Sequence, residues 1–144
     1  MTDQSRRLAG TLLILLPTVV LGGVSILTLL IRDPSYMENP LRQDLWRAGH
    51  AHAGVLLVLS LIMLRYVDEA RLSEGARRFV RNSVPAAAIL LPLAFFLSVL
   101  SPDAEEPNAL IYLAYVGAVL VVLGVFVLGL GLIRRRTDEQ SQDA

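Results

Sequence analysis

Four long stretches without a charged residue run through this chain of 144 residues and restrict what it can fold into. They cover Leu8–Ile31, Ala48–Leu64, Asn82–Ser101 and Pro107–Ile133. Each is close to or above the roughly 20 residues that a helix needs to cross about 30 Å of hydrocarbon. Because a segment inside a bilayer must satisfy its own backbone hydrogen bonds, these stretches predict helices. We therefore expect an all-α integral membrane four-helix bundle.

The length and the order of these stretches predict one domain, residues 1–144, whose natural surroundings are the lipid bilayer. We expect its helices at about 8–31, 47–67, 80–101 and 108–133. The first apolar run is too long for the core of a signal peptide, and no small-residue cleavage site precedes the charged loop. The polar tail at 134–144 has the composition of a disordered cytoplasmic segment.

The arginines predict the orientation of the chain, because loops rich in basic residues stay in the cytoplasm. All thirteen basic residues are arginine. Ten of them lie in the two termini or between the second and third helices: Arg6, Arg7, Arg65, Arg71, Arg77, Arg78, Arg81, Arg134, Arg135 and Arg136. The other side has only Arg32, Arg42 and Arg47, which nearby acidic residues balance. We therefore predict that both termini are cytoplasmic (N-in/C-in), in the plasma (inner) membrane of a bacterium.

The only two histidines, His50 and His52, lie one residue apart at the outer end of the second predicted helix. Positions two apart on a helix point in nearly opposite directions, so this pair cannot chelate one ion from a regular helix. Three arrangements remain: an irregular segment in which both rings converge, one ring facing the bundle and one facing away, or two separate sites. Imidazole titrates near neutral pH and binds both metals and haem iron.

Small residues surround both imidazoles, and Gly49 and Gly54 leave surface against which a flat macrocycle can lie. Arg47, directly before the segment, is suited to pair with a haem propionate or with a lipid phosphate. The alternative is that Gly49 and Ala53 form a small-xxx-small pair that brings another helix close. In that case the histidines only hydrogen-bond to loop carbonyls at the water interface.

A bare transition metal, copper or zinc, is the other cofactor that the histidines predict. The loop before the second helix leads directly into the motif and offers Met37, Glu38 and Asp44 to complete a shell around His50 or His52. We therefore expect the cofactor to be haem b or a transition metal.

The segment RAGHAHAGVLLVLSL resembles a His-bearing segment that recurs in small four-helix membrane proteins of bacteria whose function is unassigned. It is also distantly similar to helices of the haem-copper oxidase superfamily in which a His near the outer face ligates haem. The likeness covers about twenty residues around His50 and His52, outside the catalytic helices of an oxidase, and the chain has no third histidine. The resemblance therefore implies at most a haem-ligand role for His50 or His52, and no oxidase reaction.

Gly117, Gly124 and Gly131 are spaced seven residues apart in the last predicted helix. This spacing places them near one stripe, where a neighbouring backbone can approach closely. We expect the stripe to pack on another helix, so it is also the predicted contact for a second copy of the chain or for partner membrane subunits.

Several functional classes are disfavoured by what the sequence lacks. It has no Cys, which excludes disulfides, thiolate metal sites and cysteine catalysis. It has no basic face for nucleic acid, and no Ser-His-Asp set or Gly-rich phosphate loop, so we do not expect an enzyme. No span carries a charge at its centre, which argues against an ion pump or a proton-driven transporter.

Three functions remain. The leading prediction is binding of haem or a transition metal at the extracytoplasmic end of the second helix, in an electron-transfer or accessory role. The main alternative is a non-catalytic structural or assembly subunit of a membrane complex. The third, a small-solute carrier or channel, is favoured only by the prolines within the helices, Pro17, Pro85 and Pro92.

Overall fold

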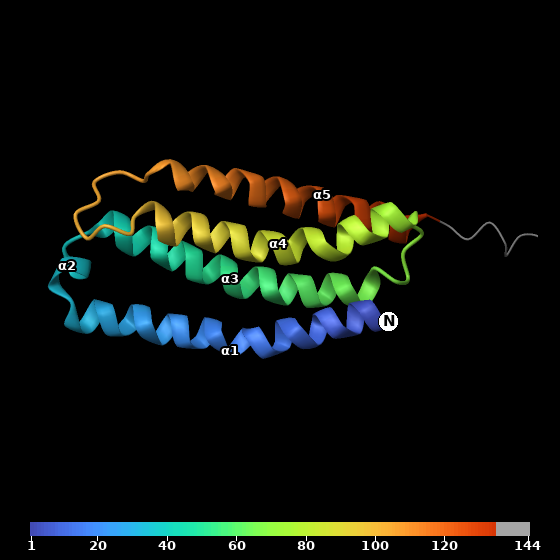
Figure 1. Cartoon of the computed structure of the whole chain (residues 1–144), viewed down its shortest axis with the longest axis horizontal. Coiled ribbons are helices and arrows are strands. Elements are labelled where there is room, and N and C mark those ends of the chain that lie inside the picture. The colour runs from blue at the N-terminus through green and yellow to red at the C-terminus, as the bar shows by residue number, and fades with distance from the viewer. Residues whose placement is uncertain (135–144) are drawn as a thin grey trace, which may run out of the picture.

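The computed structural model describes residues 1–134, in which four long helices lie side by side, each antiparallel to the one before it in the chain (Figure 1). The elements are α1 (Asp3–Arg32), α2 (Pro34–Met37), α3 (Pro40–Tyr66), α4 (Glu74–Ser98), the 3-10 helix η1 (Ala109–Tyr112) and α5 (Leu113–Ile133). No strand occurs between residues 1 and 134, so the prediction of an all-α fold is confirmed. Helices α1, α3, α4 and the joined η1–α5 are long and apolar enough to cross a membrane. Residues 135–144 of the predicted tail lie outside the described residues.

Three of the helices begin well before the predicted positions. The observed first residues are Asp3, Pro40 and Glu74, where the apolar runs predicted about 8, 47 and 80. In each case the preceding residue caps the helix, because its side chain accepts a backbone N–H of the first turn. These capping residues are Thr2, Asn39 and Ser73. The apolar runs therefore mark the parts of the helices suited to lipid, and the caps mark where the helices begin.

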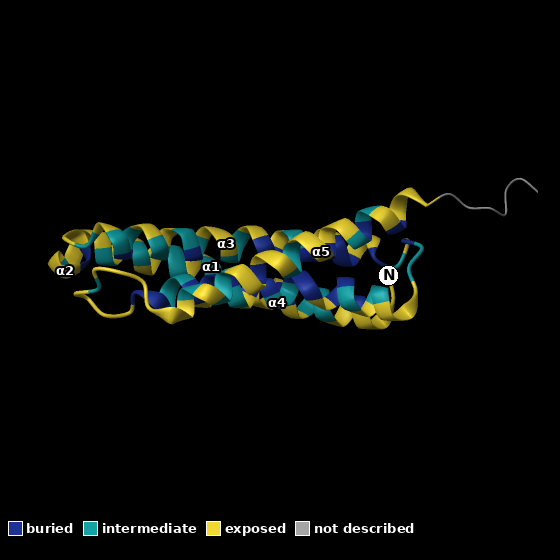
Figure 2. Ribbon diagram, turned by 90° about the horizontal axis from the view of Figure 1, so that it is seen from above, coloured by how far each residue is buried: buried dark blue, intermediate teal, exposed yellow. Residues whose placement is uncertain are grey.

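The long helices pack in the order α1, α3, α4, α5 (Figure 1). Helix α4 packs extensively on both α3 and α5, whereas α1 packs mainly on α3 and makes no extensive contact with α4 or α5. Only Ser5 and Leu12 of α1 are buried. Figure 2 shows exposed residues along the outer surfaces of the helices, and in α1, α3 and α5 these exposed positions are largely apolar. Such a surface is suited to contact with lipid.

The glycine stripe of α5 faces inward, toward α4 and the turn that precedes it. A Cβ atom added at Gly117 would lie 2.8 Å from Cγ of Leu91, and one at Gly131 would lie 2.7 Å from Cδ2 of Leu72. One at Gly124 would overlap Oγ of Ser83. The sequence assigned this stripe to a second copy or a partner subunit as well, but within residues 1–134 it is α4 and its preceding turn that occupy it.

Buried polar groups attach the start of α1 to the connection between α3 and α4. The Arg81 guanidinium donates hydrogen bonds to Oγ of Ser5 (3.1 Å), to Oε1 of Gln4 (2.7 Å) and to Oδ1 of Asp68 (3.1 Å). The backbone N–H of Thr2 donates to the other carboxylate oxygen of Asp68 at 2.6 Å. This polar cluster holds α1 at the end of the bundle opposite the histidines.

Candidate functional site

His50 and His52 both lie within regular α-helix, so an irregular segment with converging rings is excluded. The His50 ring faces α1. A Cβ atom added at Gly23 would lie 3.0 Å from both Nε2 and Cε1 of His50, and one at Gly22 would lie 3.8 Å from its Nδ1. The imidazole of His50 therefore packs against the backbone of α1. Gly22 and Gly23 form the only Gly-Gly pair in the sequence. This pair was the one sequence feature that could have predicted a close approach of another helix to this part of α1.

The His52 ring lies on the α4 side of α3 and is exposed. Its centroid is 5.2 Å from that of Phe95, and its Nδ1 is 2.7 Å from the carbonyl oxygen of Ala48. A carbonyl oxygen can only accept, so Nδ1 carries the proton and donates. The lone pair of the neutral ring then lies on Nε2. Histidines that bind metals commonly donate their other ring N–H to a carbonyl in this way, which fixes the tautomer and the ring orientation.

The two glycines of the motif have different surroundings. A Cβ atom on Gly49 would lie 3.1 Å from Cε2 of Phe96 and 3.2 Å from Cβ of Phe95, so Gly49 allows α3 and α4 to approach closely. Gly49 therefore serves close packing between helices, as the second reading of the motif predicted, and α4 covers its surface. A Cβ atom on Gly54 would lie 3.5 Å from Cγ1 of Val19 in α1, and Gly54 borders an open groove of about 430 Å³. The groove is lined by Val19, His50, Ala51, Gly54, Val55 and Val58.

Arg47 is exposed and already has partners near the outer end of α3. Its Nη2 lies 3.2 Å from Oδ1 of Asp44, and its Nε donates to the carbonyl oxygen of Gln43 at 3.1 Å. At about 100° per residue, Arg47 lies roughly 60° around the helix from His50 and roughly 140° from His52. It is therefore placed to meet a group in the groove beside His50, and it faces away from His52.

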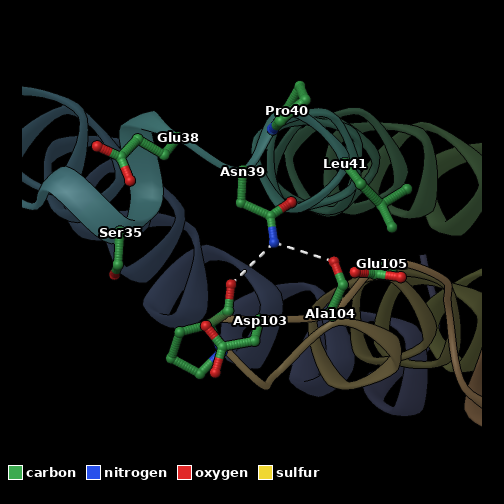
Figure 3. A pocket seen from close by; sticks show the side chains of 9 residues that line it. Ser35, Glu38, Asn39, Pro40, Leu41, Asp103, Ala104 and Glu105 are labelled. Carbon is green, nitrogen blue, oxygen red and sulfur yellow. Dashed lines mark hydrogen bonds between the residues drawn. The ribbon is translucent and has the colours of Figure 1, made fainter.

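Glu38 lines a different cavity, of about 530 Å³, between the start of α3 and the loop that follows α4 (Figure 3). Asn39 joins the two walls of this cavity by donating to the carbonyl oxygens of Pro102 (2.9 Å) and Ala104 (3.0 Å). Met37 is exposed at the end of α2. No three His, Asp or Glu side chains within residues 1–134 are close enough together to hold a metal ion. Glu38 and Asp44 therefore do not complete a three-residue shell with either histidine.

These observations define an all-helical protein with four helices suited to crossing a membrane and two separately facing histidines near one end of the bundle. No protein-family model, no curated protein and no solved structure matches the chain.

Proposed function

We propose that the chain is an integral membrane protein that crosses the plasma membrane of a bacterium four times, with both termini in the cytoplasm. The N-terminus and the connection between α3 and α4 lie at the same end of the bundle (Figure 1), and this end holds most of the arginines. Basic loops stay in the cytoplasm, so this asymmetry favours the stated orientation. It puts His50 and His52 near the extracytoplasmic side.

We also propose that His52 ligates haem iron there, in an electron-transfer or accessory role. The observation that supports this most directly is the hydrogen bond from Nδ1 to the carbonyl of Ala48, which leaves Nε2 of an exposed ring as the free donor atom. Haem needs only one axial imidazole from a chain. Another copy of the chain would supply a further imidazole from its own His52. A bare metal ion fits less well, because a closed zinc or copper shell needs more protein ligands than one histidine.

His50 is the less suitable haem ligand, although the sequence alone did not distinguish it from His52. Its Nε2 edge lies against Gly23, so an iron atom reaches it only if α1 moves away from α3. His50→Ala is thus a matched control for His52→Ala, because it removes the same side chain two residues away.

The test is the absorption spectrum and the metal content of the protein purified in detergent from its native membrane. We expect a Soret band in the wild-type protein and in His50→Ala, and its loss in His52→Ala. Wild-type protein with neither a Soret band nor stoichiometric metal would contradict the proposal, as would a band that depends on His50 alone.

The second candidate function is a structural or assembly subunit of a membrane complex. One observation favours it: Gly49 and Gly23 serve close packing between helices, which accounts for two small residues at this end without any ligand. On this alternative the purified protein carries no cofactor, and replacement of His52 leaves its association with partner subunits unchanged.

A further inference from the structure

A second polar site lies at the same end of the bundle and centres on Arg42. Arg42 is 9% exposed, and its guanidinium carbon lies 4.3 Å from the centroid of the Trp46 ring. Within residues 1–134 its side chain forms no ion pair and no hydrogen bond, and its Nε is fully buried. The guanidinium is always charged, and leaving its buried Nε–H without an acceptor costs free energy.

Tyr36 of α2 adds another donor without a partner beside the same tryptophan. Tyr36 is 1% exposed, and its ring centroid lies 5.7 Å from that of Trp46. Its hydroxyl is buried and has no hydrogen-bond partner among the described residues. Burial raises the pKa of Tyr36, against smaller opposing effects of Arg47 and Arg42, so the hydroxyl keeps its proton and can donate.

The contrast with Arg81 shows what is unusual about Arg42. Arg81 is also buried, but its guanidinium donates to Asp68, Ser5 and Gln4. The carboxylates near Arg42 are engaged elsewhere: Asp33 accepts from the hydroxyl and the backbone of Ser35, and Asp44 pairs with Arg47. The Nε of Arg42 and the hydroxyl of Tyr36 are thus two buried donors without an acceptor in the described part of the chain, and both residues lie against Trp46.

We propose that Arg42 and Tyr36 form a binding site for a phosphate group. The planar fork of arginine matches the oxygens of a phosphate, and a tetrahedral phosphate can accept from a hydroxyl at the same time. In the proposed orientation the site lies near the outer headgroups, where phosphate is the most abundant anion. The phosphate belongs either to a phospholipid or to a soluble ion. This site is separate from His52 and does not depend on haem binding.

The test uses the full-length chain, delipidated and purified in detergent. Its thermal stability is measured with inorganic phosphate, with phosphatidylglycerol, and with diacylglycerol, which lacks the phosphate. We expect a phosphate-bearing ligand to raise the melting temperature and diacylglycerol to have no comparable effect. A response to inorganic phosphate identifies a soluble ion as ligand, and a response to phosphatidylglycerol alone identifies the lipid.

The variants decide whether the response comes from this site. Arg42→Met should weaken phosphate binding at least tenfold, whereas Arg32→Met removes the same charge from an exposed position at the same end and should not. Should Arg42→Met not fold, Tyr36→Phe provides the second variant, because it removes only a hydroxyl without a partner. Tyr36→Phe should keep or raise the melting temperature without ligand and weaken binding about tenfold. No response of the wild-type chain to either phosphate compound, or the same loss in Arg32→Met, would overturn the proposal.

Discussion

The imidazole of His50 lies against Gly23 so closely that an added Cβ atom would be 3.0 Å from two of its ring atoms. This contact joins α1 to α3 near one end, and the cluster around Arg81 joins α1 to the bundle at the other. Between the two attachments α1 packs mainly on α3, with Leu12 in the buried core and Leu16 and Val19 partly buried beside it. Gly23 therefore leaves the room that the His50 ring occupies between α1 and α3.

Replacement of Gly23 with leucine should force the His50 ring away and loosen α1. Overpacking of this kind costs about 1–3 kcal/mol. The control is Gly10→Leu in the same helix, because a Cβ at Gly10 would meet no atom within 4 Å other than its chain neighbours and the backbone of its own helix. Thermal unfolding in detergent should show a lower melting temperature for Gly23→Leu than for Gly10→Leu. Equal melting temperatures would mean that the contact with His50 contributes nothing to the packing of α1.

The glycine stripe of α5 gives a second prediction about packing. Gly124→Leu should separate α5 from α4, since even a Cβ atom would overlap the Ser83 hydroxyl. Gly129→Leu is the matched control, because Gly129 lies in the same helix with nothing within 4 Å of its Cβ position. We expect Gly124→Leu alone to lower the melting temperature of the protein. If both variants melt like the wild-type protein, α5 does not depend on this stripe.

The polar cluster at the start of α1 predicts that stability depends on pH. Burial alone would raise the pKa of Asp68, but hydrogen bonds from Thr2, Ser5 and Arg81 outweigh burial and hold the pKa below its ordinary value. A carboxyl group with a lowered folded-state pKa stabilises the fold above its unfolded pKa of about 3.9, and this contribution is lost as pH falls through the folded-state value. Asp68→Asn should therefore be less stable than wild type at pH 7.

The difference in stability between wild type and Asp68→Asn should shrink as the pH falls below about 4. The control is Asp3→Asn, because Asp3 forms a highly exposed ion pair with Arg6, and such pairs contribute little. Melting curves at pH 7 and at the lowest pH that the detergent allows measure both variants. A difference that stays constant with pH would show that the carboxylate charge of Asp68 has no part in attaching α1.

The sequence was informative where the relevant property is local. Uncharged length located the four helices. The 100° turn per residue limited His50 and His52 to three arrangements, and the regular helix excludes the one in which the rings converge. The helix starts were missed because hydropathy was followed alone, although Thr2, Asn39 and Ser73 are ordinary capping residues.

The contacts between residues of different helices could not be predicted, because the periodicity of a sequence does not show which helices are neighbours. That His50 meets Gly23 and that Gly49 meets Phe96 follow from α3 lying between α1 and α4. The sequence did not identify α4 as the helix that packs on Gly124, because a stripe of small residues does not specify which helix covers it. Arg42 was counted only as a charge, because its burial beside Trp46 exists only in the folded chain.

The orientation can be tested directly because the chain has no cysteine, so each added cysteine is the only one that reacts. We choose Glu38→Cys, Gly75→Cys and Glu105→Cys, which lie at exposed positions at the two ends of the bundle. A membrane-impermeant maleimide applied to intact cells should label positions 38 and 105 and spare position 75. Position 75 should react only after permeabilisation, because its loop is rich in arginine and is expected to remain in the cytoplasm. Labelling of position 75 in intact cells would reverse the orientation and move both His52 and Arg42 to the cytoplasmic side.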